Sequence, residues 1–298
     1  MTKSVQATIA ALLGYSIFGF SFLFSKLALQ VASPLVLNAA RFLTAFLTLN
    51  ILLLTGKIKL SLSGKPIHKL LLLGFIQPVL YFILESRAIS ISTVTFSGLI
   101  IGLSPVIGLV LGAVFLKERC TWFQAVCTIL SVVGVAMTGT DGFGTVSMLG
   151  FVLLLATAVC AAVFPIVSRS IAPLFSAYER TYVMIGMGCV IFPIMALLKH
   201  RQDLHALTAP LSSGIFWIAV VYLAVVSSVG AFLLLNYSLN HIPAGRTLIF
   251  SNFTTVISVL VGILILGDRF SLLQFIGIVV ITLSVFGVSY QKPEVQRQ

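Results

Sequence analysis

Long runs of apolar residues alternate with short polar stretches along the chain. Each run extends over roughly twenty residues, the length at which an α-helix crosses the hydrocarbon core of a bilayer. Strands of a membrane barrel would instead alternate apolar and polar residues. The pattern therefore predicts an all-α integral membrane protein with ten transmembrane helices, over residues 5–29, 34–55, 69–90, 93–115, 121–138, 147–168, 177–198, 214–238, 246–266 and 271–290.

Composition and charge support this assignment and add an orientation. Of the 298 residues, 59% are hydrophobic and 8% are charged, whereas a soluble domain has roughly 25% charged residues. The net charge of +11 comes from Lys and Arg at the ends of apolar runs, which argues against a nucleic-acid-binding face. Placing the N-terminus in the cytoplasm puts twelve Lys and Arg inside and five outside. The bias predicts that both termini are cytoplasmic.

Several classes of protein and site find no support in the motifs. The cysteines form no Cys-x-x-Cys pair, and the histidines lie in loops or at helix ends without metal-ligand spacing. A phosphate-binding Gly-Lys loop is not found either. The first apolar run, from Val5 to Leu29, is too long for the core of a signal peptide and is expected to be a retained helix. We expect no metal, no cofactor, no ATP-driven step and no enzyme activity.

The second half of the chain repeats the first. A shift of 150 residues aligns 116–124 with 266–274 and Ser104-xxx-Gly108 with Thr254-xxx-Ser258. Each half holds five predicted spans, and because five is odd the second half must enter the membrane from the opposite face. Inverted repeats of this kind are common in secondary transporters. We predict two five-helix repeats, residues 1–146 and 147–298.

Smaller shifts align the beginnings of the two halves. A shift of 143 pairs Lys26 with Arg169, and a shift of 139 pairs Pro34 and Arg41 with Pro173 and Arg180. Matched basic residues fit symmetric gates, helix anchors or attraction of an anionic substrate group. For Lys26 and Arg169 the simpler explanation is snorkelling of the side chain to the headgroups. Lys26, Arg41 and Arg180 are candidates for coupling or gating, with Arg41 the deepest in its span.

A family resemblance rests on short motifs that occur in order and in duplicate. They are Phe18-Gly19 with Lys26, Pro34 with Arg41-Phe42, Ser104-Pro105 with 115–119, and 266–269. The chain resembles the ten-helix EamA-type branch of the drug/metabolite transporter superfamily over about residues 5–290. Phe18 stands where such proteins often have Trp, and Thr255 where they often have Pro. The resemblance implies alternating access, a central cavity, and transport of amino acids or related metabolites, often outward.

Glu85 is the acidic residue placed well inside a predicted span, and an ionisable group there is a functional hypothesis by default. Its repeat partner at a shift of 150 is Leu235, so the shared scaffold does not require an acid. One interpretation is a carboxylate that couples protons or binds a cation. The other is an ion pair with Arg41, which lies at similar depth and would serve packing or gating.

Other polar and aromatic residues near the middle of spans are candidates for the wall of a substrate-binding cavity. Asn252 could contact substrate or bond to a neighbouring helix, since an unpaired amide is costly in lipid. The substrate-binding candidates are Tyr15, Phe18, Tyr81, Glu85, Ser104, Phe164, Asn236, Tyr237 and Asn252.

Together these features predict a secondary transporter in the plasma (inner) membrane that moves small metabolites such as amino acids, mainly for export, with proton coupling or exchange. The expected partners are a small-molecule metabolite, membrane lipid and protons, but no nucleic acid; we expect a monomer or weak dimer. One alternative is an uptake carrier for a small cationic or sugar-like solute. Another is a membrane-embedded enzyme or assembly factor, although an enzyme needs several catalytic groups at one depth.

Overall fold

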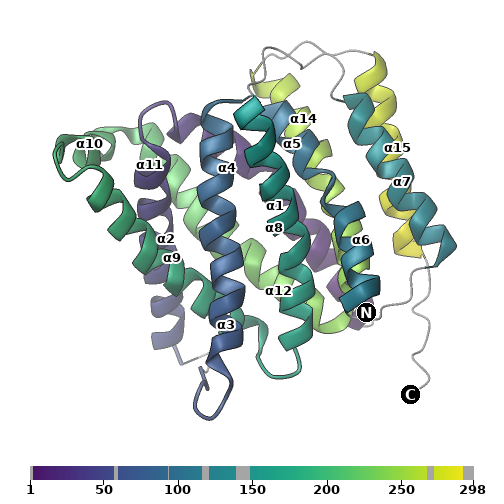
Figure 1. Cartoon of the computed structure of the whole chain (residues 1–298), viewed down its shortest axis with the longest axis horizontal. Helices are drawn as coiled ribbons and strands as arrows, with labels where there is room; N and C mark the ends of the chain where they lie inside the picture. Colours follow the sequence, from purple (N-terminus) through teal and green to yellow (C-terminus); the bar gives the residue numbers. More distant parts are fainter. Residues whose placement is uncertain are drawn as a thin grey trace.

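The computed structural model describes residues 3–56, 60–92, 94–115, 121–138, 148–266 and 272–290, and the regular structure within them is helical throughout (Figure 1). The first half contains α1 (Lys3–Ala28), α2 (Pro34–Leu54), α3 (Ile67–Gly74), the π-helical segment η1 (Phe75–Leu80), α4 (Tyr81–Ser90), α5 (Val94–Ile101), α6 (Ser104–Phe115) and α7 (Trp122–Thr138).

The second half repeats this order with two added short elements, α10 and η2. It contains α8 (Met148–Ile171), α9 (Ala177–Lys199), α10 (His205–Thr208), the 3-10 turn η2 (Ala209–Ser212), α11 (Gly214–Val221), the π-helical segment η3 (Tyr222–Ala231), α12 (Phe232–His241), α13 (Ala244–Ile249), α14 (Asn252–Leu266) and α15 (Leu272–Tyr290). The predicted boundary between residues 146 and 147 lies outside the described residues, as do the repeated segments 116–120 and 267–271.

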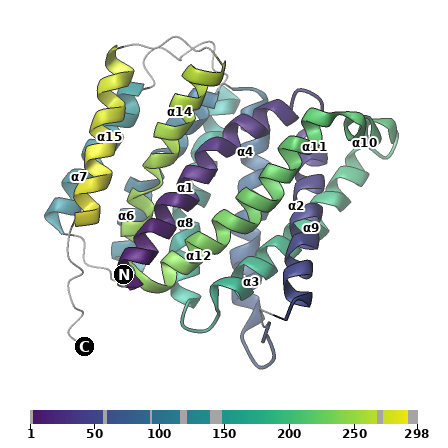
Figure 2. The same ribbon diagram turned by 180° about the vertical axis from the view of Figure 1, so that it is seen from behind.

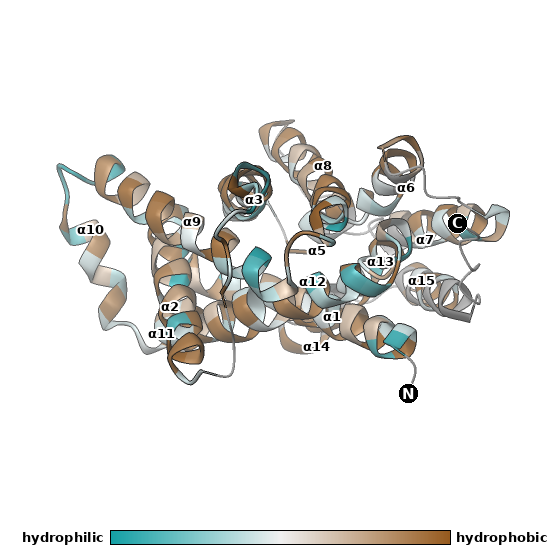
Figure 3. Ribbon diagram, turned by 90° about the horizontal axis from the view of Figure 1, so that it is seen from below, coloured by the Kyte–Doolittle hydropathy of each residue, from teal (hydrophilic) through white to brown (hydrophobic). Residues whose placement is uncertain are grey.

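Seven helical segments in the described part of the chain are long and apolar enough to cross a membrane, and three shorter apolar helices accompany them. Each of the ten overlaps one predicted span, with ends that differ by a few residues. Large apolar side chains are exposed along the outer faces of these helices, as at Leu47, Ile51 and Leu54 of α2. Figure 3 shows how widely hydrophobic residues cover the helices. Such surfaces are stable in lipid, so the fold is that of an all-α integral membrane protein.

The fourth and ninth predicted spans are each interrupted: the fourth near its middle, next to Pro105, where a kink or hinge was expected, and the ninth close to its start, where none was. The first break, at Gly102 and Leu103, separates α5 from α6, and the second, at Phe250 and Ser251, separates α13 from α14. Pro105 follows the first break in the opening turn of α6, where its missing N–H leaves no hydrogen bond unmade. Discontinuous helices are a common source of substrate sites in transporters, because they bring unpaired backbone groups to a cavity.

The two halves interlock. α1 packs against α12 and α14 of the second half, and α8 packs in the equivalent way against α4 and α6 of the first half. α2 pairs with α9, and α7 pairs with α15 at one edge of the molecule (Figures 1 and 2). Each half therefore fills the other's interior, as two repeats related by a pseudo-twofold axis do.

Hydrogen bonds at equivalent positions define the register of the repeat. The Lys26 ammonium donates to the carbonyl of Ile89 at 3.3 Å, and the Arg169 guanidinium donates to the carbonyl of Leu239 at 2.6 Å. These pairs agree with a shift of 143 in the first helix of each half and of 150 in the third.

The second helix of each half also follows a shift of 143. Ser33 and Ser176 cap α2 and α9, and Asn38 bonds to Ser86 as Thr181 bonds to Asn236. This replaces the shift of 139 that paired Arg41 with Arg180. In the structural register Arg41 aligns with Met184, and Arg180 aligns with Leu37. The two arginines are thus not equivalent, because the sequence match was displaced by one helical turn.

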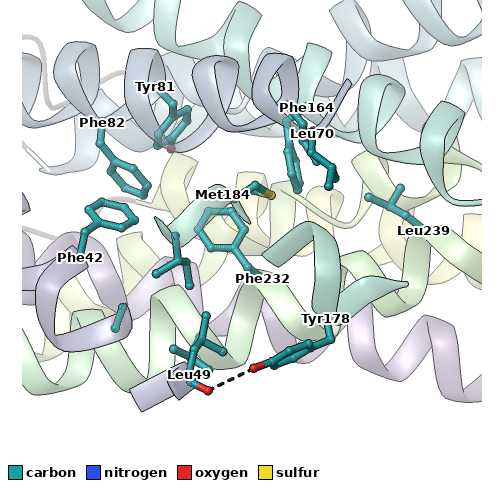
Figure 4. Packing of buried hydrophobic residues seen from close by; sticks show 14 of the residues in the cluster. Phe42, Leu49, Leu70, Tyr81, Phe82, Phe164, Tyr178, Met184, Phe232 and Leu239 are labelled. Atoms are coloured by element: carbon teal, nitrogen blue, oxygen red, sulfur yellow. Dashed lines mark hydrogen bonds between the residues drawn. The ribbon is translucent and has the colours of Figure 1, made fainter. Parts of the chain in front are cut away.

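An aromatic core lies between the paired helices. The rings of Phe42 and Phe82 meet edge to face at 5.4 Å, and Phe164 and Phe232 meet similarly at 5.8 Å (Figure 4). The Tyr178 hydroxyl donates to the carbonyl of Leu49 at 3.1 Å. Close packing of α2 on α9 requires Gly188, since a Cβ there would lie 2.7 Å from a ring carbon of Phe42.

Candidate functional site

A central cavity opens where the two broken helices meet. The hydroxyls of Ser104 and Ser251 lie 3.4 Å apart at this crossing, and the Thr255 hydroxyl donates to the carbonyl of Gly98 at 3.2 Å. The empty space is about 730 Å³, including the part open to solvent. Its wall comprises Tyr15, Phe18, Ser21, Phe22, Ser25, Arg41, Gln77, Tyr81, Phe82, Glu85, Gly98, Ile101, Gly102, Ser104, Ala161, Phe164, Leu235, Leu248, Ser251, Thr254 and Thr255.

The cavity lies on the pseudo-twofold axis, because equivalent positions of the two halves face it from both sides. The pairs are Phe18 and Ala161, Ser21 and Phe164, Glu85 and Leu235, Gly98 and Leu248, Ile101 and Ser251, and Ser104 and Thr254. The scaffold is therefore symmetric, but its chemistry is not. The two charged wall residues, Arg41 and Glu85, have the apolar counterparts Met184 and Leu235.

Arg41 is buried and is held by neutral groups. Its Nε donates to the hydroxyl of Ser228 at 2.7 Å, and one terminal nitrogen donates to the hydroxyl of Ser227 at 3.0 Å. The guanidinium carbon lies 4.2 Å from the centre of the Phe82 ring, a cation–π arrangement. The other terminal nitrogen has no partner in the described structure. The side chain is fixed in place by the opposite half and still has one free donor.

Glu85 lies on α4 beside the same cavity. One carboxylate oxygen accepts a hydrogen bond from the hydroxyl of Tyr81 at 2.8 Å, and the second has no partner among the described residues. The ion pair found within 4 Å in the described part of the chain is Lys65 with Glu179. The predicted alternative of a direct Arg41–Glu85 ion pair is thus not formed in this conformation. The cavity instead presents two separate charges of opposite sign.

The structure brings together seven of the residues that the sequence singled out. Six substrate-binding candidates line the cavity with Arg41, namely Tyr15, Phe18, Tyr81, Glu85, Ser104 and Phe164. Five others lie elsewhere, and their substrate-binding or gating roles stay predictions without support from the cavity geometry: Lys26, Arg180, Asn236, Tyr237 and Asn252.

Arg180 and Asn236 belong to one buried network away from the cavity. The Arg180 guanidinium donates to the carbonyls of Ser168 and Asn236 and to the side chains of Ser168 and Asn240. The Asn236 amide donates to the hydroxyl of Thr181 at 2.9 Å. These bonds join α8, α9 and α12 and satisfy a buried cation with neutral acceptors.

The remaining candidates contact neighbouring helices. The Asn252 amide donates to the hydroxyl of Ser131 at 2.6 Å, joining α14 to α7. The Tyr237 hydroxyl donates to the side chain of Gln6 at 3.3 Å. Lys26 bonds to the carbonyls of Ile89 and Ser92 at the end of α4.

Sequence reasoning missed several polar residues of the cavity wall, among them Ser21, Gln77 and Thr254. Serine and threonine are frequent in membrane helices, so their hydroxyls carry little signal. Gln77 was detectable in principle, because a glutamine followed by proline interrupts the apolar run of residues 69–90.

A second polar cluster, Lys65 with Glu179, lies on the side of the molecule at which α2 ends and α9 begins. Lys65 contacts both oxygens of the Glu179 carboxylate at 2.8 and 3.0 Å, and the backbone N–H groups of Ser61 and Ser176 donate to it as well. At the opposite side, His200 lies 3.0 Å from the hydroxyl of Ser33, the N-cap of α2. Each loop between the second and third spans of one half thus bonds to the other half.

This architecture defines a helical membrane protein with a central cavity between two interlocked repeats. The EamA-like transporter family model matches the chain twice, over residues 6–140 and 148–290. The chain therefore belongs to the EamA-like transporter family, within the drug/metabolite transporter superfamily suggested by its sequence.

Individual proteins agree with this assignment. The chain is 34% identical to the uncharacterized transporter YcxC of Bacillus subtilis (strain 168), over 96% of this chain and 93% of that protein. It is 28% identical to the uncharacterized transporter YyaM of the same organism, over 93% and 92%. One crystal structure, 19% identical, superposes with a TM-score of 0.76 over 95% of this chain and 98% of the other, which shows the shared fold.

Proposed function

We propose that this protein is a secondary transporter in the plasma membrane that binds zwitterionic, amino-acid-like metabolites between Arg41 and Glu85. The observation that carries the proposal is that both residues line one cavity without a direct ion pair within 4 Å between them. A zwitterion offers a carboxylate to the free donor of Arg41 and an ammonium group to the free oxygen of Glu85. Such charge-assisted hydrogen bonds are strong in a water-poor site.

The same pair of charges disfavours the alternative substrates. A simple cation would be attracted by Glu85 but repelled by Arg41, and a neutral sugar would leave both charges unpaired in the cavity. The apolar and aromatic wall, including Phe18, Phe82 and Phe164, suits the carbon skeleton of an amphipathic metabolite.

We further propose that transport is outward and driven by proton exchange. Outward movement follows from the resemblance to EamA-type carriers. The substrate's ammonium group and a proton compete for the same oxygen of Glu85, so release of one favours binding of the other. This competition would couple the export of one zwitterion to the entry of one proton, with no nucleotide required.

The test is a set of three matched ligands applied to proteoliposomes without nucleotide: an amino acid, the amine that lacks its carboxylate, and the acid that lacks its ammonium group. The amino acid should compete best for uptake into the vesicles. Arg41→Gln should abolish the preference for the amino acid over the amine, and Glu85→Gln should abolish its preference over the acid.

The expected loss in each variant is about tenfold or more, since hydrogen bonds to charged groups contribute roughly 1.5–3 kcal/mol. Equal loss for all three ligands would contradict the assignment of separate charge sites. A requirement for ATP would contradict secondary transport.

A further inference from the structure

Gln77 is a polar residue of the cavity wall whose side chain has no protein partner. The residue is 5% exposed, its Oε1 accepts no hydrogen bond, and its Nε2 donates none to any described residue. Other polar wall residues are paired: Ser21 bonds to the carbonyl of Ile17, and Thr254 bonds to that of Tyr15. A buried carboxamide without partners is costly, so its presence in the wall needs a reason.

The backbone holds this carboxamide in the wall. The helix running from residue 67 to 90 is interrupted at Gln77, whose φ and ψ are −145° and 118°, and Pro78 follows. An extended residue before proline is sterically favoured, so the local sequence accounts for the break. The break alone does not explain why residue 77 is a glutamine, because an apolar residue can adopt the same extended conformation before proline.

Comparison of the two halves separates Gln77 from the shared scaffold. At the shift of 150 its counterpart is Ser227, whose hydroxyl accepts a hydrogen bond from Arg41. The counterpart therefore has a structural partner, whereas Gln77 has none. Arg180 does not supply one, because its guanidinium bonds to Ser168, Asn236 and Asn240.

Gln77, Tyr81 and Glu85 are spaced four residues apart and all three line the cavity. Gln77 lies eight residues before Glu85, at the other end of the segment that begins at the interruption. It is thus well separated from the carboxylate that would hold the substrate's ammonium group. A substrate anchored by its charges would reach Gln77 with its side chain.

We infer that Gln77 is a specificity-determining residue that recognises a neutral hydrogen-bonding group on the substrate's side chain, such as a carboxamide. A carboxamide both donates and accepts, so a second carboxamide complements it with two bonds. The inference rests on the proposed function and adds the class of side chain: polar and uncharged. A site built to bond a polar group discriminates strongly against an analogue that lacks it.

The experiment compares glutamine with methionine, which are similar in length but differ in the terminal amide, as competitors in the proteoliposome assay. The wild-type protein should prefer glutamine by about tenfold. Gln77→Met, which keeps the length of the side chain, should bring the two ligands to near parity. Gln30→Met, at an exposed position at the end of α1, is the matched control and should retain the wild-type preference.

Melting temperature separates recognition from a structural role. Because Gln77 has no partner to lose, Gln77→Met should leave the melting temperature of the substrate-free protein unchanged or raise it. A lower melting temperature, or equal loss of both ligands, would overturn the inference, as would an unchanged preference for glutamine. If neither amino acid binds the wild-type protein, the proposed function fails and the inference falls with it. Binding of both without discrimination overturns the inference alone.

Discussion

At the residue scale, the contacts of Arg41 and Glu85 bear on the two interpretations that the sequence left open, because no direct ion pair joins them among the described residues. Arg41 is held by Ser227, Ser228 and the Phe82 ring, and Glu85 is held by Tyr81. Neither depends on the other for its position. Breaking a buried ion pair is costly because the remaining charge loses its partner. Here, removing either charge leaves the hydrogen-bond partners of the other in place.

The first prediction follows from this geometry. Glu85→Gln should change the unfolding free energy by less than about 1 kcal/mol, compared with roughly 3–5 kcal/mol for breaking a buried ion pair. Transport should fall by tenfold or more, and its response to a pH gradient should be lost. Melting temperature, flux and the pH dependence of flux are the measurements.

The control is the double variant Glu85→Gln with Arg41→Gln. If the two residues only neutralised each other, the double variant would recover both stability and transport. We expect it to stay inactive. A strongly destabilised single variant rescued by the second change would restore the ion-pair interpretation.

At the element scale, loops on opposite sides connect the two halves through bonds of different strength. The Lys65–Glu179 pair and the backbone N–H of Ser61 join the loop of residues 60–66 to the start of α9. On the other side, a single bond joins His200 to Ser33. We expect the ion pair to hold its side closed when the cavity is open to the other side, as alternating access requires.

We call the Lys65–Glu179 ion pair the latch, and Glu179→Gln tests whether it holds this side closed. The amide keeps the oxygen that caps α9, since glutamine serves equally in a capping box, but it loses the charge that attracts Lys65. Lys65 is partly exposed, so solvent screening limits the loss to about 1–2 kcal/mol. The open population on this side should rise about fivefold to thirtyfold.

The measurement is the rate at which a thiol reagent labels Leu49→Cys, a buried position in the last part of α2, with and without Glu179→Gln. Asp203→Asn is the matched control, because Asp203 caps a turn in the loop on the opposite side. Faster labelling in the control, or no change with Glu179→Gln, would argue against the latch.

At the scale of the whole molecule, duplication and inversion determine the topology. α1 and α15 belong to halves of five spans each, and the start of α1 and the end of α15 lie on the same side of the helices (Figure 2). The charge bias predicts that this side is cytoplasmic. The two halves pack into each other, and residues of both halves line the one cavity.

Reporter fusions after Asp141 and after Gln298 test this topology, since they follow the fifth and the tenth span. The fusion after Asp141 should report the outer side and the fusion after Gln298 the cytoplasm. If both fusions reported the same side, the inverted repeat would be wrong.

The membrane fold, the ten spans and the duplication could be predicted from the sequence, because each can be read from the order of apolar and polar residues along the chain. A run of about twenty apolar residues must form a helix in lipid wherever it lies in the chain. Glu85 and Arg41 were also recognisable, since a charge within such a run is costly and therefore conspicuous. Periodicity could not show the breaks at Gly102 and Ser251, because both flanking segments are equally apolar.

The three-dimensional packing was needed to show which polar residues share the cavity and which hold helices together. Arg180 and Asn252 were as prominent in the sequence as Arg41, but α8, α12 and α7 supply their partners. The proposed role of Gln77 in substrate recognition rests on its side-chain oxygen, which the fold leaves without a hydrogen-bond partner. Hydrogen bonds between residues more than 40 apart in the chain depend on helix rotation and register, and hydropathy contains no information on either.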